Sequence, residues 1–149
     1  MNKRVRNFLM QGEGEQLDYK QTISSARKIA KTMSAFANHK GGTLLIGIRD
    51  NRSVSGIRSE EEKHMLDVAA SFFVKPEVKI TVIEHLIDNK QVLECQIPEG
   101  DLKPYYAKTE DDKWMAYIRV KDRSLLASKV VVDVLKRQQA NKGLSLIHI

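Results

Sequence analysis

The sequence predicts an α+β fold, in which a mixed β-sheet is flanked by helices. Two amphipathic helical patterns in the first half are followed by a continuous aliphatic run at residues 43–48, which is typical of a central strand buried on both faces. The second half holds alternating apolar and polar segments that are separated by turn residues, as in antiparallel strands. The order is helix, strand, helix, strand, strand, helix and then a β-rich half, which differs from a regular βαβ alternation.

The chain begins with a short helix and a short strand. Residues 4–11 have amphipathic spacing and end at Gly12, so a helix is expected there with a glycine turn after it. Residues 15–21 alternate between apolar and polar side chains. This pattern predicts a strand with Leu17 and Tyr19 on one face.

A longer helix and the aliphatic strand follow. From Ser24 or Ser25, either of which can cap a helix, apolar residues recur at helical spacing up to residue 37. Gly41 and Gly42 then form a strong stop signal, because glycine adopts the left-handed conformation that ends many helices. The strand at residues 43–48 is therefore expected directly after this helix.

The remaining elements are predicted from turn residues and periodicity. In chain order they are a turn with a short partner strand at 49–57, a helix at 59–73 capped by Ser59, a hairpin at 77–98 turning at 88–90, two strands at 103–108 and 114–120 joined by an exposed turn, and a final helix at 125–139. The last seven residues, GLSLIHI, differ in composition from the basic helix before them. They indicate a tail foreign to the domain, or a truncation junction.

Charge is distributed unevenly along the chain. The 149 residues carry a formal charge of +6, and 42% of them are hydrophobic, enough to bury the core of one domain. Residues 1–40 hold 8 Lys/Arg against 3 Asp/Glu, residues 41–100 hold 7 against 10, and residues 101–149 hold 10 against 6. Two basic ends around an acidic middle suit a polyanionic partner, although excess lysine also serves solubility.

Several classes of protein are excluded or disfavoured by composition. No apolar run approaches the roughly 20 residues that span a bilayer, and the first residues lack the pattern of a secretion signal. The single cysteine, Cys95, excludes an internal disulfide, and the four histidines share no ligand spacing with it, so a zinc site is not expected. We expect a cytoplasmic protein that does not associate with membranes.

Three segments together resemble a known family. They are GEGEQLDYKQ at residues 12–21, SAFANHKGGTLLIGIRDNRSVSGI at 34–57 and YIRVKDRSLLAS at 117–128. In this combination the chain resembles the Schlafen AlbA-like domain, which occurs in bacterial proteins described as transcriptional regulators and in the vertebrate Schlafen proteins. The resemblance divides the chain into an N-terminal helix at 1–11, a nucleic-acid-binding domain at 12–128, and a C-terminal helix with its tail at 129–149.

The resemblance first implies binding to DNA or RNA in a regulator or defence-type protein. Glycines without a Cβ let a phosphate approach backbone N–H groups, and basic side chains attract the phosphate backbone irrespective of sequence. A helix C-cap explains the two glycines equally well without any ligand. The expected nucleic-acid-binding residues are Lys20, Arg27, Lys28, Lys31, Asn38, Lys40, Gly41, Gly42, Arg119, Lys121 and Arg123.

The resemblance also implies an alternative function, that of an endoribonuclease. Vertebrate Schlafen proteins of one group cleave structured RNA with three acidic residues, which correspond here to Glu13, Asp18 and Asp50. Such carboxylates hold Mg²⁺ or Mn²⁺, which activate water and stabilise a leaving oxygen. Asp18 stands where that group has Glu, and the vertebrate core has two AlbA-like lobes, so a single copy would need to form a homodimer to make a comparable groove.

Two further patterns in the sequence are weaker. ATP binding has been attributed to similar proteins, but Lys40 precedes the glycines rather than following them as in a phosphate-binding loop. Tyr105, Tyr106 and Trp114 lie near several lysines, as in a strip that stacks bases. Strand aromatics are more often core residues, which is the favoured interpretation for Tyr117 and for at least one of the tyrosine pair.

Overall fold

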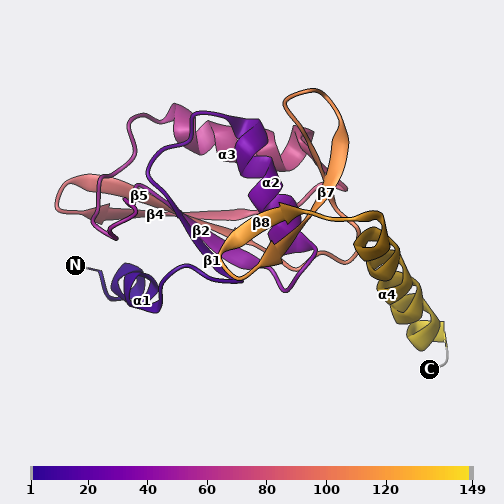
Figure 1. Ribbon diagram of the computed structural model, residues 1–149. Coiled ribbons are helices and arrows are strands. Elements are labelled where there is room, and N and C mark those ends of the chain that lie inside the picture. The colour runs from indigo at the N-terminus through magenta and orange to yellow at the C-terminus, as the bar shows by residue number, and fades with distance from the viewer. Residues whose placement is uncertain (1, 148–149) are drawn as a thin grey trace.

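Two four-stranded sheets enclose one long helix (Figure 1). The computed structural model describes the backbone of residues 2–147 and the side chains of residues 2–142. Its helices are α1 (Lys3–Gln11), α2 (Ala26–Ala37), α3 (Glu61–Phe72) and α4 (Lys129–Ile147). Its strands are β1 (Leu17–Lys20), β2 (Gly42–Ile46), β3 (Val74–Lys75), β4 (Thr81–Ile87), β5 (Lys90–Ile97), β6 (Tyr106–Lys108), β7 (Trp114–Val120) and β8 (Arg123–Leu126).

The first sheet is mixed, as predicted. Its order is β1-β2-β5-β4, with β1 parallel to β2 and the other pairs antiparallel. Strand β2 is central and its residues Leu44, Leu45 and Ile46 are fully buried, which confirms the prediction for the aliphatic run. The β4–β5 hairpin turns at Asp88 and Asn89, which both have positive φ, as the favoured two-residue hairpin turn requires.

The second sheet is antiparallel in the order β3-β6-β7-β8. Helix α2 lies between the two sheets, and its residues Met33 and Phe36 belong to a core that also contains Leu44 of β2 and Tyr117 of β7. The α+β class is therefore confirmed. Three details differ from prediction. Residues 123–126 form β8, although the final helix was expected to begin at 125, and β3 was not predicted. The partner strand expected at 49–57 is only an isolated bridge between Ile48 and Val54.

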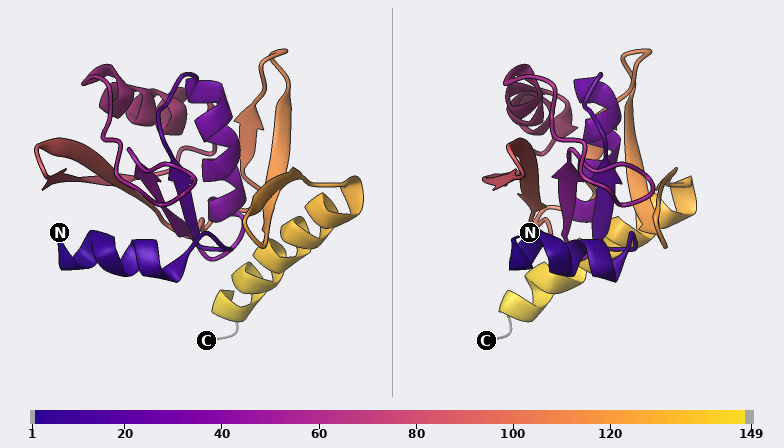
Figure 2. Two further views of the ribbon diagram at one scale, coloured as in Figure 1. Left: turned by 60° about the vertical axis from the view of Figure 1, so that its left-hand side comes forward. Right: turned by 90° about the vertical axis from the view of Figure 1, so that its left-hand side faces the viewer.

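Helix α1 covers the opposite face of the first sheet (Figure 2). Val5 and Leu9, one turn apart on α1, are buried against Tyr19 and Leu45 of that sheet. Asn2 caps the helix by accepting hydrogen bonds from the N–H groups of Arg4 and Val5. The chain thus begins with a helix that is packed onto the domain.

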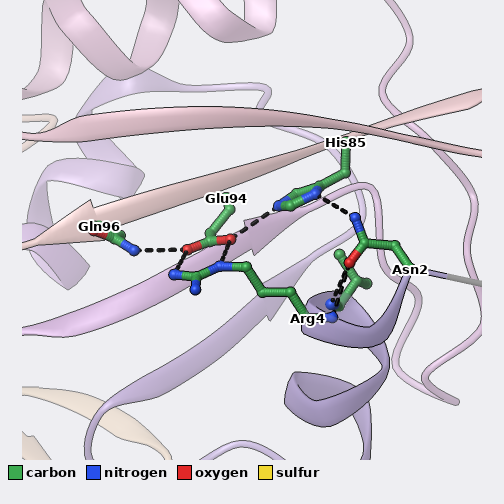
Figure 3. Close-up of polar contacts among 6 residues, drawn as sticks. Asn2, Arg4, His85, Glu94 and Gln96 are labelled. Carbon is green, nitrogen blue, oxygen red and sulfur yellow. Dashed lines mark hydrogen bonds and ion pairs between the residues drawn. The ribbon is translucent and has the colours of Figure 1, made fainter.

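A polar network also fastens α1 to the sheet (Figure 3). Glu94 of β5 is fully buried and accepts two hydrogen bonds of 2.7 Å from the guanidinium of Arg4. It also accepts from Gln96 and from Nε2 of His85. The amide of Asn2 donates to Nδ1 of His85, so the capping residue and the ion pair form one connected network.

The remaining helices differ from prediction at their ends. Ser25 caps α2, as expected, but α3 has Glu60 rather than Ser59 at its N-cap, without a side-chain capping bond. Buried Glu62 instead reaches back to accept from the N–H groups of Arg58 and Ser59. Helix α4 continues to Ile147, so the backbone of residues 143–147 belongs to it; the interpretation of these residues as a foreign tail stays a prediction, and residues 148–149 lie outside the described part.

Candidate nucleic-acid interface

Two of the three predicted acidic residues form a pair at the edge strand β1. Glu13 accepts a hydrogen bond of 3.0 Å from the N–H of Tyr19, and its carboxyl group lies against that of buried Asp18. Desolvation and the hydrogen bond to Asp18 raise the pKa of Glu13 to about 7, against the opposing effect of the Tyr19 N–H. Glu13 can therefore hold a proton near neutral pH.

Arg119 lies beneath this pair and is not part of an exposed ridge. Its guanidinium lies 3.5 Å from Asp18, donates to the carbonyl oxygens of Gly14 and Leu17, and packs over the ring of Phe36. The side chain is only 1% exposed. The prediction that Arg119 contacts nucleic acid is thus wrong, because strand alternation turns it inward, where it ties β7 to β1.

Three lysines lie at the end of β1 and on the first turns of α2, and we call Lys20, Lys28 and Lys31 the lysine cluster. Lys20 ends β1, with its ammonium 3.3 Å from Asp18, and it lines with Lys28 a hollow of about 230 Å³ at the N-terminus of α2. Lys31 lies one turn further along α2, over the ring of Tyr117. Helix N-termini carry partial positive charge, so the hollow and the cluster favour anions together.

The hollow also has hydroxyl groups, two of which were predicted only as candidate helix caps. Thr22, Ser24 and Ser25 line it between the two lysines. A run of Ser and Thr between a strand ending in Lys and a helix beginning with basic residues was the signal that could have identified this site. Arg27, by contrast, turns away from the hollow to pair with Asp112 and the carbonyl of Thr109.

Gly41 and Gly42, which form the diglycine corner, are packed closely against other parts of the protein, but Gly42 also borders an open hollow of about 420 Å³ that Lys79 and Gln96 line, so their phosphate-binding role stays a prediction. Gly41 has φ +76°, donates to the carbonyl of Phe36, and is packed so closely that a Cβ would lie 2.7 Å from the carbonyl oxygen of Ile97. A Cβ on Gly42 would lie 2.7 Å from the ring of Phe36. The two glycines follow the end of α2, and their lack of a Cβ lets neighbouring groups of the protein pack against them, which confirms the helix-stop interpretation.

Asn38 is likewise engaged inside the protein. Its amide donates to the carbonyls of Tyr105 and Tyr117, and its oxygen accepts from the N–H of Tyr105. Its hydrogen bonds therefore join α2 to the second sheet. Because Asn38 is only 6% exposed, it is not available to a nucleic acid. Lys40 is exposed but follows the C-terminus of α2, roughly 18 Å along the helix from its basic N-terminal end.

Lys121 and Arg123 are exposed at the turn between β7 and β8. The neighbouring Ser124 accepts from Arg119, which bonds to the carbonyls of Gly14 and Leu17, so this turn lies on the side where β1 begins. Lys20 ends the same strand. The exposed cations therefore lie towards both ends of β1, with the carboxylate pair between them.

The third predicted acid does not complete a metal site. Asp50 is exposed in the turn at residues 49–52. Within the part of the chain that the structure describes, no three Asp, Glu, His or Cys side chains lie close enough together to hold one metal ion. The carboxylate pair has Lys20 and Arg119 as neighbours, which take the place of a cation, so these residues do not fit Mg²⁺ or Mn²⁺ in this arrangement.

The comparison with known families agrees with the residues quoted above. The family described as Schlafen, AlbA_2 matches residues 13–128, most of the chain. This protein belongs to the Schlafen AlbA_2 family. No curated protein matches it.

Two solved structures share the Schlafen AlbA_2 fold. The DIP2311 protein from Corynebacterium diphtheriae has a TM-score of 0.64 at 16% identity, over 91% of this chain and 31% of that one. The N-terminal domain of a RecG-related protein from Nitrosomonas europaea has a TM-score of 0.54 at 22% identity, over 74% of this chain and 83% of that domain. Identities this low show the fold alone, and the chain spans about a third of DIP2311.

Among the described residues of this Schlafen AlbA_2 chain, no helix has both the length and the apolar character needed to cross a bilayer.

Proposed function

We propose that this domain binds the phosphate backbone of DNA or RNA along the edge of β1, within a larger regulator or defence-type protein. The observation that carries the proposal is the hollow at the N-terminus of α2, which Lys20 and Lys28 line, with Lys31 one turn further along the helix over the ring of Tyr117. The amides of the first helical turn and the ammonium groups of Lys20 and Lys28 then attract an anion into this hollow, and Lys31 adds positive charge further along the helix. The name of the RecG-related protein, whose N-terminal domain has the same fold, gives independent support.

Lys121 and Arg123 extend this surface. They lie near the start of β1, whereas the lysine cluster lies near its end, so a strand laid along the edge would contact both groups. Ordinary backbone attraction of this kind is independent of base sequence. The proposal thus moves the interface from the diglycine corner, where it was predicted, to the other end of α2.

The experiment is fluorescence anisotropy with a labelled duplex at low salt. The variant Lys20→Ala/Lys28→Ala/Lys31→Ala is expected to lose at least tenfold in affinity, because three phosphate contacts disappear. The control Lys3→Ala/Lys90→Ala/Lys136→Ala removes the same charge from exposed positions on α1, the β4–β5 hairpin and α4, and is expected to change affinity by less than threefold. Equal losses in both variants would mean that net charge alone attracts the nucleic acid and would overturn the proposal.

A second candidate function, cleavage of an RNA phosphodiester, is favoured by one observation. Glu13, with its pKa near 7, can accept or donate a proton beside the lysine cluster at physiological pH. Incubating labelled tRNA with the protein, with and without Mn²⁺, tests it alongside Glu13→Gln. RNA fragments from the wild type that are missing with Glu13→Gln support cleavage, and intact tRNA in every lane eliminates this candidate.

A further inference from the structure

An aromatic hollow lies on the outer face of the second sheet. Its residues are distant in sequence from the lysine cluster. It has a volume of about 420 Å³ and is lined by Lys75, Pro76, Pro104, Tyr106 and Trp114. Tyr106 and Trp114 present flat aromatic surfaces, and Pro76 and Pro104 add apolar ring surfaces. The volume falls within the usual range for sites that hold small ligands or parts of larger ones.

The strand register explains why these rings share one face. Tyr106 lies opposite Lys75 on one side and opposite Ala116 on the other. Trp114 is two residues from Ala116 in β7, so it points the same way as Tyr106 and is its diagonal neighbour. The inward face of the same sheet is used for the core, through Tyr117 and Ala107.

The two aromatic side chains are not needed to fill the core. Trp114 is 38% exposed and Tyr106 is half-buried, whereas Tyr105 and Tyr117 are buried. The prediction that core packing claims Tyr117 and one of the tyrosine pair is therefore confirmed. Tyr106 and Trp114 are left as an open stacking surface.

Charge distinguishes among the ligands that flat rings could hold. The charged member of the lining set is Lys75, with its ammonium 5.7 Å from the centre of the Trp114 ring. Lys108 lies opposite Trp114 on the same face. An aromatic surface with cations beside it matches a ligand that joins a flat ring to an anion, which is the description of a nucleotide.

We infer that this hollow holds an unpaired base of single-stranded DNA or RNA, stacked on Trp114, with its phosphate near Lys75. The inference deepens the proposed function and rests on it. The lysine cluster would supply attraction to any phosphate backbone, whereas this hollow would give the domain a preference for unpaired over paired strands. A base within a duplex cannot reach it without leaving its stack.

The test uses Trp114 as its own probe, because it is the chain's single tryptophan. A twelve-nucleotide single strand is expected to quench its fluorescence, and an abasic strand of the same length is not. By anisotropy, Trp114→Ala should lose about 5- to 100-fold in affinity for the single strand, the usual range for one stacked base, with duplex affinity within twofold. Trp114→Phe should keep most of the affinity, and Lys75→Ala should reduce it without altering the fold.

Several results would overturn the inference. Equal quenching by the abasic strand, or unchanged single-strand affinity in both Trp114→Ala and Lys75→Ala, would remove the stacked base. Quenching by a proline-rich peptide and not by the oligonucleotide would assign the hollow to a peptide. Sedimentation showing a homodimer that shields Trp114 would assign the hollow to a second copy, together with exposed Val120 and Leu125 further along the same sheet.

The two proposals fail separately. Salt-sensitive duplex binding that depends on the lysine cluster, together with an unaffected Trp114→Ala, would overturn the stacked base alone. Absence of binding to either kind of strand would overturn both.

Discussion

Glu13 and Asp18 illustrate how two acidic side chains are accommodated side by side at the edge of a sheet. Asp18 is buried and has cations on both sides, Lys20 and Arg119. Glu13 is exposed as a residue, but its carboxyl group is partly desolvated against β1 and meets the negative charge of Asp18. The raised pKa of Glu13 follows, because the charged form loses hydration and meets a like charge.

This raised pKa predicts a pH-dependent contribution to stability. Folded Glu13 binds its proton up to about pH 7, whereas an unfolded glutamate releases it near 4.5, so the contribution is complete below pH 4.5 and is lost as pH rises to 7. Glu13→Gln mimics the protonated form at every pH. The free energy of unfolding of the wild type, relative to Glu13→Gln, should fall by roughly 1 kcal/mol between pH 4.5 and 7.5, a value reduced for solvent screening.

Urea denaturation at a series of pH values measures this difference. The control Glu110→Gln alters an exposed glutamate of the β6–β7 turn. The difference in the free energy of unfolding between the wild type and this control should not change with pH over the same range. If the difference between the wild type and Glu13→Gln is also independent of pH, Glu13 does not hold a proton in the folded protein at neutral pH.

At the scale of elements, α1 is held to the first sheet by packing and by charge. Burial alone would raise the pKa of Glu94, but hydrogen bonds from Arg4, His85 and Gln96 outweigh it and lower the value to about 2. The ion pair therefore stabilises the fold at neutral pH, and its contribution is lost as pH falls from about 4.5 towards 2. The Asn2 amide donates to Nδ1 of His85, which leaves Nε2 facing Glu94 at 2.9 Å.

Removing Arg4 should therefore loosen α1. Arg4→Met keeps much of the side-chain volume but leaves the buried carboxylate of Glu94 without its ionic partner, which should lower the free energy of unfolding by about 2 kcal/mol. Arg6→Met removes the same charge from an exposed position on α1 and should cost less than about 0.5 kcal/mol. Chemical denaturation compares them, and equal costs would contradict the role of the network.

At the scale of the whole molecule, the structural features that could be predicted are those that depend on residues close together in the chain. The helix stop at Gly41, the hairpin at Asp88–Asn89 and the cap at Ser25 each depend on residues that are neighbours in the chain. The Schlafen AlbA_2 family was likewise recognisable from short motifs. These features need no knowledge of how distant elements pack.

Long-range packing decided the features that could not be predicted. Asn38 and Arg119 look like polar surface residues in the sequence, but α2 lies between two sheets and buries both. The spacing of Glu13, Asp18 and Asp50 likewise does not reveal which of them meet, and the structure pairs two. Sequence alternation identifies the two faces of a strand, but it does not show which face a distant helix covers.

The salt dependence of nucleic-acid binding tests the central claim most directly. The logarithm of the binding constant for a duplex should fall linearly with the logarithm of salt concentration, with about 0.9 units of slope for each phosphate neutralised. Removing the lysine cluster should reduce the magnitude of this slope by about two to three units, and the charge-matched control at Lys3, Lys90 and Lys136 should reduce it by less than about one. Identical slopes for the two triple variants would contradict the assignment of the interface to the β1 edge and the N-terminus of α2.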